Sequence, residues 1–261
     1  PVFRVQQGEG PVSFLVGTMH SEDPRVTALM AQITPLIAQV EVVAVELVPD
    51  GVTMLAVGAA SLLPVGQDLE TLIGDARFRR LVAAATGRGI PREVLRRLKP
   101  WAAAVMLGMP ASESGRVLDL QIYLQALETG RELVGLETAA EQLAVFEEMS
   151  AETQLMLLDE MVKNAEALPK YLEELTVVYL SGDLEQLDEQ AWAQYRDMPT
   201  PIRDWFEHSL IASRNRRMAE RAAELVEQRP VLLAVGAMHL SGETGLVEAL
   251  RRRGFSVTPV S

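Results

Sequence analysis

Two of the three histidines in this chain stand in matching contexts. His20 closes the segment Gly17-Thr18-Met19-His20 and His239 closes Gly236-Ala237-Met238-His239, each directly behind a run of apolar residues. With glycine at roughly 7% of positions, two of three histidines share this offset by chance about once in a hundred cases. Glycine lets a backbone turn sharply or approach a ligand closely. The pair therefore predicts a site that uses two imidazoles, although either ring alone equally fits a histidine that only hydrogen-bonds a loop.

Two glutamates also follow short apolar runs. Glu46 comes directly after residues 42–45, and Glu137 directly after residues 133–136. If these runs are parallel strands, their carboxyl ends share one sheet edge, where ligands bind, and we expect both glutamates and both histidines to face one cleft. Two imidazoles and two carboxylates suit a divalent metal ion such as Mn, Co, Zn or Fe, with one position left for water. Water bound there is acidified for attack on a carbonyl group.

Other polar residues leave alternatives open. Glu46 is equally compatible with a solvated strand end or a helix cap, and Glu137 with the start of a helix. The run Arg214-Asn215-Arg216-Arg217 must place some polar side chains inward if it is helical. An inward arginine suits a substrate carboxylate or an oxyanion. His208 has no preceding glycine at this offset and is expected to be structural or exposed.

The elements that must position these residues are short strands and long helical stretches. Strands are predicted at residues 2–6, 12–16, 42–45, 132–136, 231–235 and 256–260. Helical insertions are predicted at about 51–129 and 139–228, because apolar residues there keep a helical period between Gly and Pro breaks. The predicted fold class is mixed α/β (α+β): one domain over 1–261, with a central mixed sheet built from both chain ends and a cleft at the carboxyl ends of its strands.

Composition narrows the function by exclusion. The 261 residues include 24 Lys and Arg against 36 Asp and Glu, a formal net charge of −12, and no Cys. The charge disfavours nucleic-acid partners and anionic membranes, and the lack of Cys excludes disulfides and thiolate ligands. No apolar run is long enough for a membrane span. The sequence starts at Pro1, so we expect a periplasmic or secreted protein if an export signal was removed and a cytoplasmic one otherwise. A homodimer is compatible with the helical segments, but no heptad seam specifies it.

With these motifs in order, the chain resembles the bacterial TraB/GumN family, which is related to the Tiki metalloproteases. The resemblance runs from about residue 2 to residue 260. It is carried by Phe14-Leu15-Val16-Gly17-Thr18-Met19-His20, Leu98-Lys99-Pro100-Trp101, Val134-Gly135-Leu136-Glu137-Thr138, Arg214-Asn215-Arg216-Arg217-Met218-Ala219 and Val235-Gly236-Ala237-Met238-His239-Leu240. The resemblance implies a metal-dependent, peptidase-like site built from two Gly-x-x-His motifs and acidic residues. The wider group also resembles erythromycin esterases and a haem-binding lipoprotein.

The leading hypothesis is a metal-dependent hydrolase that cleaves peptide bonds. His20, His239, Glu46 and Glu137 are the candidate metal ligands, with Glu46 as the base that deprotonates water. Arg214 is the candidate for oxyanion stabilisation, and Arg214 with Asn215 falls in an internal motif expected to bind a peptide or small-molecule substrate. One alternative is a metal-independent, esterase-like hydrolase in which a His–Glu pair activates water. Another is a non-catalytic protein that holds a peptide or a haem-like ligand under a helical lid.

Overall fold

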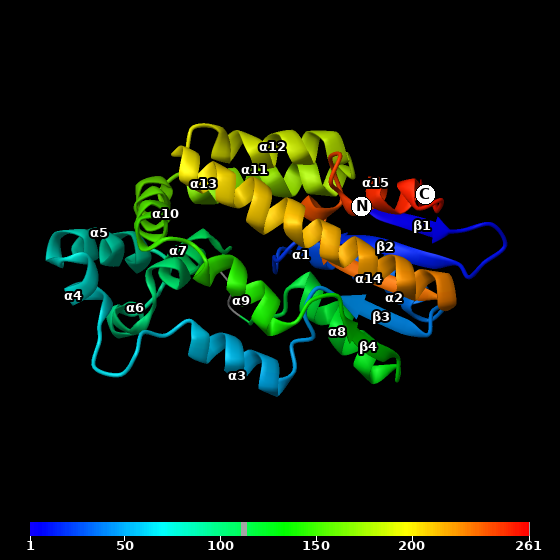
Figure 1. The fold of residues 1–261 in the computed structure, drawn as a ribbon, viewed down its shortest axis with the longest axis horizontal. Helices are drawn as coiled ribbons and strands as arrows, with labels where there is room; N and C mark the ends of the chain where they lie inside the picture. The colour runs from blue at the N-terminus through cyan, green and yellow to red at the C-terminus, as the bar shows by residue number, and fades with distance from the viewer. Residues whose placement is uncertain (111–113, 261) are drawn as a thin grey trace.

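The computed structural model describes residues 1–110 and 114–260, and within them six strands form one mixed sheet. The strands are β1 (Val2–Gln6), β2 (Ser13–Thr18), β3 (Val42–Val45), β4 (Glu132–Gly135), β5 (Val231–Gly236) and β6 (Ser256–Pro259), in the spatial order β4-β3-β5-β2-β1-β6. Figure 1 shows the sheet at one end of the molecule, with the two chain termini close together beside it. The predicted mixed sheet that draws strands from both chain ends is confirmed.

Four neighbouring strands run in the same direction. β4, β3, β5 and β2 pair in parallel, whereas β1 pairs antiparallel with both β2 and β6. β2 ends two residues later than predicted, because it stays paired with β5 as far as Thr18 opposite Gly236. The carboxyl ends of the four parallel strands therefore meet at one edge of the sheet, as the sequence predicts.

The central strands are apolar on both faces because helices cover both faces. All four residues of β3 are buried. One face packs against α14 (Arg214–Gln228) and α15 (Leu246–Arg252), and small residues such as Ala219, Ala222 and Ala223 let α14 lie close to the sheet. The other face packs against α2 (Met30–Ile37) and α8 (Leu118–Glu128). The short helix α1 (Pro24–Thr27) precedes α2.

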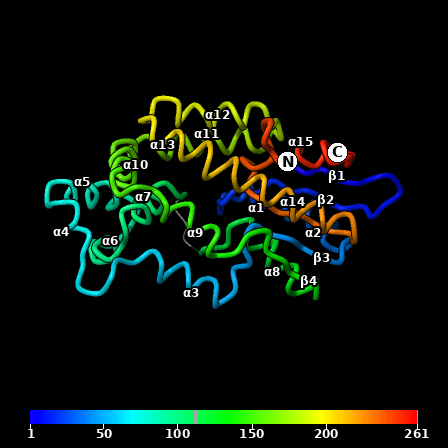
Figure 2. Tube along the Cα trace, viewed as in Figure 1, coloured from blue at the N-terminus to red at the C-terminus, as the bar shows by residue number. Residues whose placement is uncertain are grey.

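The two insertions form a helical lobe with its own apolar cluster. The first insertion contributes α3 (Gly51–Ala60), α4 (Leu69–Ile73), α5 (Asp75–Thr86), α6 (Arg92–Arg97) and α7 (Pro100–Gly108), and the second contributes α9 (Ala139–Glu147), α10 (Ala151–Asn164), α11 (Leu168–Ser181), α12 (Leu184–Arg196) and α13 (Thr200–Asp204). In Figure 2, α4, α5, α6, α7 and α10 lie at the end away from β1, and α3 extends along one side between them and the sheet. α11 and α12 reach toward the chain termini, and Tyr179 and Leu187 of these helices pack in the same cluster as residues of the sheet. Among the described residues, no helix has the length and apolar content needed to cross a membrane.

Two irregular helical segments adjoin the strand ends. The π-helix η1 (Trp205–Ser213) lies between α13 and α14, so Arg214 is the first residue of α14. π-Helical turns are rare and shift the side chains that follow them around the helix axis. The 3₁₀ turn η2 (Ala237–His239) follows β5 directly. Both segments deliver polar side chains to the sheet edge where the parallel strands end.

Candidate functional site

The two Gly-x-x-His turns lie side by side, and their glycines are required by close packing. A Cβ atom on Gly17 would lie 2.6 Å from Leu240 Cδ1, so the first turn packs directly on the second. A Cβ on Gly236 would lie 3.1 Å from Glu46 Oε1, which accepts a 2.5 Å hydrogen bond from the Gly236 N–H. The glycine spacing therefore reflects close contact between the two turns and room for the Glu46 carboxylate.

Arg214 is the centre of a buried group that we call the Arg214 cluster, made of Arg214, Glu46, Glu137, His239 and Asn215. Arg214 Nη2 donates to Glu46 Oε2 and to Glu137 Oε2, each at 2.6 Å, and Arg214 Nε donates to Glu137 Oε2 at 2.8 Å. Arg214 Nη1 lies 3.1 Å from His239 Nε2. One guanidinium thus joins three of the side chains that the sequence predicts to form the site.

The hydrogen bonds of His239 define the protonation of its ring. His239 Nδ1 lies 2.6 Å from Asn215 Oδ1, which is assigned as the amide oxygen and can only accept, so Nδ1 carries the proton. Nε2 then offers its lone pair to Arg214 Nη1. Burial, together with the charge of Arg214, lowers the His239 pKa to about 4 despite the opposing effect of Glu46. The imidazole is therefore neutral near pH 7, with Nε2 as an acceptor.

The charged members of the cluster stay charged. Burial alone would raise the pKa of Glu46, but the interactions with His239 and Arg214 and the Gly236 hydrogen bond lower it to about 2. Burial alone would lower the pKa of Arg214, but Glu46 and Glu137 outweigh it and raise that pKa. Glu137 has no exposed side-chain surface and also accepts a 2.5 Å hydrogen bond from Arg217 Nη2. The cluster is a compact network of ionised groups around a neutral imidazole.

His20 lies outside the Arg214 cluster and pairs with a residue that the sequence analysis missed. Its side chain is 56% exposed, and its Nδ1 lies 3.7 Å from Asp119 Oδ2. Thr18 Oγ1 donates to Asp119 Oδ1, whereas the buried Oδ2 atom has no hydrogen-bond partner among the residues that the structure describes. Asp119 is in the first turn of α8 and does not follow a strand in the sequence, so no motif or spacing marks it as a site residue. We call His20 and Asp119 the His20 pair.

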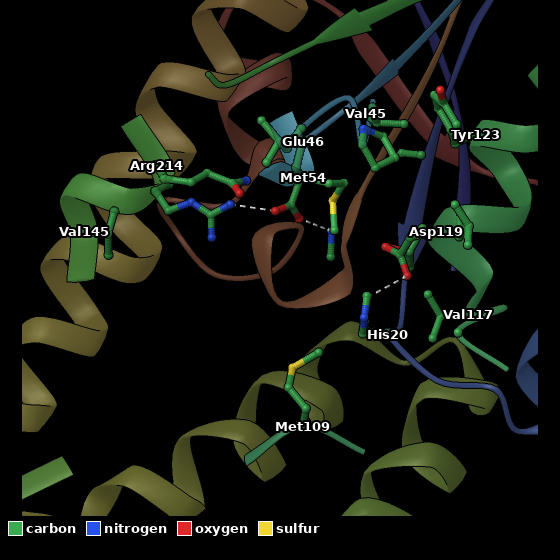
Figure 3. A pocket seen from close by; sticks show the side chains of 18 of the residues that line it. His20, Val45, Glu46, Met54, Met109, Val117, Asp119, Tyr123, Val145 and Arg214 are labelled. Carbon is green, nitrogen blue, oxygen red and sulfur yellow. Dashed lines mark hydrogen bonds and ion pairs between the residues drawn. The ribbon is translucent and has the colours of Figure 1, made fainter. Parts of the chain in front are cut away.

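The Arg214 cluster and the His20 pair meet at one cavity of about 610 Å³. Its polar lining comes from His20 and Asp119 on one side and Glu46 and Arg214 on the other, as Figure 3 shows. The expectation that all four strand-end groups face one cleft is met by His20 and Glu46. Glu137 and His239 are instead buried against Arg214, because α14 brings that side chain across the strand ends.

The remaining site predictions have plain outcomes. Arg214 and Asn215 face inward, as four polar residues in a row on a helix require, whereas Arg216 is exposed. Glu137 is followed by a capping box formed by Thr138 and Glu141, so a helix does begin there. His208 is exposed, and its Nδ1 contacts Asp204 O at 3.0 Å.

The donor types fit a divalent transition-metal ion, but they form two pairs. Among the described residues, no three His, Asp or Glu side chains already lie at metal-ligand spacing. Glu46 Oε1 lies 3.9 Å from His239 Nε2, and that nitrogen is occupied by Arg214 Nη1. The His20 pair is more accessible than the pair of Glu46 and His239, and among the described residues Asp119 Oδ2 has no hydrogen-bond partner. Imidazole nitrogen with carboxylate oxygen suits Mn, Fe, Co or Zn.

Fold and site together define an α/β protein with histidines, carboxylates and a buried arginine at the carboxyl ends of parallel strands. The model of the TraB/PrgY/gumN family matches residues 1–259, and the chain belongs to that family. No solved structure matches the chain.

Curated relatives are similar at modest identity. Metalloprotease TIKI1 of Danio rerio is 24% identical, with 95% of this chain and 60% of the relative covered. Metalloprotease TIKI2 of Danio rerio is 24% identical, with 95% and 58% covered, and Metalloprotease TIKI1 of Xenopus tropicalis is 23% identical, with 95% and 59% covered. The chain therefore spans about 60% of the length of these relatives.

Proposed function

We propose that this chain is a metal-dependent hydrolase that cleaves peptide bonds in the cavity between the Arg214 cluster and the His20 pair. The observation that carries the proposal is the buried Asp119 Oδ2: it lies beside the exposed His20, has no hydrogen-bond partner within residues 1–110 and 114–260, and belongs to a residue that lines the same cavity as Glu46. A buried carboxylate oxygen without a partner is costly, and a cation removes that cost. The metalloprotease names of the relatives support the same reaction class.

In this proposal His20, Asp119, Glu46 and His239 hold the ion. When bound, a divalent ion supplies Lewis acidity toward a carbonyl group and lowers the pKa of water. Asn215 fixes the His239 tautomer that leaves Nε2 as an acceptor, which is how a metal-ligating histidine is usually oriented. Binding through Nε2 requires Arg214 Nη1 to move away from it.

Glu137 is assigned a positioning role, because it holds Arg214 and Arg217 and has no exposed side-chain surface. Arg214 lines the cavity and stays charged, so it is the candidate for stabilising an oxyanion, and Asn215 supports it through His239. Glu46 is a weak base while its pKa is about 2. It becomes an effective proton acceptor once its contact with Arg214 Nη2 opens.

A second candidate is a metal-independent hydrolase in which His20, oriented by Asp119, activates water directly. The observation that favours it is that Arg214 already neutralises Glu46 and occupies His239 Nε2, which leaves the exposed His20 pair as the available proton acceptor. A histidine oriented by a carboxylate is a common general base.

Metal affinity and peptide cleavage test the two candidates. We expect His20→Ala and Asp119→Asn each to weaken Mn²⁺ or Zn²⁺ binding, measured by titration calorimetry, by at least about tenfold. Asp119→Asn keeps an acceptor for Thr18, and His208→Ala is the matched control because His208 is exposed and outside the cavity. Unchanged metal affinity in both site variants would overturn the ligand assignment. Peptide cleavage that resists a chelator would favour the metal-independent candidate.

A further inference from the structure

Helix α3 is apolar over most of its length and yet has no buried residue. Val52 is 81% exposed and Leu55 is 75% exposed, whereas the half-buried Val57 and the 55% exposed Met54 line a cavity together with residues of α7 and α9. Asp50 caps the helix by accepting a 2.8 Å hydrogen bond from the Thr53 N–H. Packing against the rest of the protein stabilises this apolar helix little. We therefore expect the face that carries Met54 and Val57 to bind a ligand.

That second cavity has a volume of about 630 Å³ and adjoins the cavity of the candidate active site. Four residues, Met54, Met109, Gln142 and Phe146, line both cavities. In Figure 3, Met54 lies beside Glu46 and Met109 lies near His20, so the shared wall begins next to the reactive groups. A substrate bound in the first cavity can therefore reach the second across these four shared residues.

Three polar side chains that line the second cavity each make a hydrogen bond within the protein. Ser61 Oγ donates to Val57 O, Arg88 Nη2 donates to Met109 O, and Gln142 Nε2 donates to Glu137 Oε2. No Asp or Glu is among the described residues that line it. Arg88 is the one charged side chain among the described lining residues, and most of the others are apolar. Away from Arg88 a polar ligand group would lose its hydration, so that part of the cavity favours an apolar group.

The wall of the second cavity also matches an apolar side chain in shape and adaptability. Trp101 and Phe146 stack with ring centroids 4.9 Å apart and give it a flat aromatic surface. Met54, Met106 and Met109 add flexible, polarisable side chains that adjust to different partners.

We propose that this second cavity is the apolar subsite of the active site and that it binds a bulky apolar side chain of a peptide substrate. This inference rests on the proposed function and adds a substrate preference to it. The occupant is a side chain of the substrate, because the cavity shares four lining residues with the cavity of the candidate active site. A second protein copy or a lipid surface would instead be expected on the outward residues Val52 and Leu55.

Two matched substitutions on α3 test the inference. Val57→Asp places a charge in the second cavity, whereas Val52→Asp places the same charge on the outer face of the same helix. The probe is N-phenyl-1-naphthylamine, a neutral fluorophore whose emission rises in apolar sites. We expect Val57→Asp to weaken probe binding by at least about tenfold and Val52→Asp by less than about twofold, because only the first desolvates a charge on binding. Val57→Trp, which fills the cavity without adding charge, should also weaken binding.

The outcomes separate this inference from the proposed hydrolase activity. Equal effects of Val57→Asp and Val52→Asp, or no effect of either, would overturn the apolar subsite. A cleavage assay then compares peptides that carry Leu or Phe with peptides that carry Ser. Val57→Asp should raise KM for the apolar peptides with kcat little changed, and should leave the Ser peptides unaffected. If the wild-type protein cleaves no peptide but Val57→Asp alone weakens probe binding, hydrolase activity is refuted while the apolar pocket is supported.

Discussion

The two histidines occupy the same position in equivalent Gly-x-x-His turns, yet their surroundings are opposite. His239 is buried, with Asn215 on Nδ1 and Arg214 on Nε2. The His20 side chain is 56% exposed, and its Nδ1 lies 3.7 Å from Asp119 Oδ2. The turn determines where each side chain leaves the sheet, and the neighbouring helices determine whether it is held. Arg214 and Asn215 at the start of α14 hold His239 behind the end of β5, whereas His20 beyond the end of β2 lines the cavity.

The charges of the two regions differ in the same way. In and around the Arg214 cluster, the carboxylates of Glu46 and Glu137 face the guanidinium groups of Arg214 and Arg217, so the charges balance around a neutral His239. In the His20 pair, one carboxylate oxygen of Asp119 has no hydrogen-bond partner in the part of the chain that the structure describes. The cluster is thus built for stability and preorganisation, and the pair is available to a ligand.

The largest effect is expected from removing the centre of the cluster. Arg214→Ala leaves Glu46 and Glu137 without their main partner, so we expect a loss of about 3–5 kcal/mol in the free energy of unfolding. Urea denaturation measures it. Arg216→Ala is the matched control, because Arg216 is exposed in the same helical turn, and it should change stability by less than about 0.5 kcal/mol. A loss below about 1 kcal/mol for Arg214→Ala would show that the cluster is not a coupled unit.

A smaller effect is expected from pH. Burial lowers the His239 pKa to about 4, below its ordinary value of 6.5. Between pH 4 and pH 6.5 this histidine is therefore protonated in the unfolded chain and neutral in the folded protein. Stability from this group is therefore complete above about pH 6.5 and is lost as the pH falls toward 4, by about 3 kcal/mol in total.

The variants His239→Gln and His20→Gln isolate this contribution. Urea denaturation at a series of pH values should show a shallower loss of stability in His239→Gln than in the wild type. His20→Gln should follow the wild-type curve, because His20 is exposed and outside the cluster. Parallel curves for the wild type and His239→Gln would contradict a neutral, buried His239.

Much of the sheet could be predicted from the sequence, because its central strands are continuous apolar runs. Residues 42–45 and 231–235 are buried on both faces, which removes the ambiguity of an alternating pattern. The end of β2 was predicted two residues early, since Gly17 and Thr18 look like turn residues in sequence. Their pairing with β5 depends on a strand more than 200 residues away, which local pattern cannot supply.

The sequence predicted several residues of the candidate site, but it did not predict how they contact one another. Glu46, Glu137 and His239 come together because they follow parallel strands, and Arg214 with Asn215 faces inward because a run of polar residues must cover all sides of a helix. That one guanidinium bridges all three depends on how α14 is set after the π-helix, which no spacing encodes. Asp119 gave no signal, since an acidic residue in a first helical turn is ordinary.

The smallest stability change is expected from His20→Ala, and it sharpens the contrast between the two turns. Because the His20 side chain is mostly exposed and has only the pair contact with Asp119, its removal should change the free energy of unfolding by less than about 0.5 kcal/mol. His239→Ala, measured by the same urea denaturation, should cost about 2 kcal/mol or more, since it leaves Arg214 Nη1 and Asn215 Oδ1 without partners in a buried site. Equal losses of unfolding free energy in the two variants would mean that contacts within the protein also fix His20. The His20 pair would then not be free to bind a ligand.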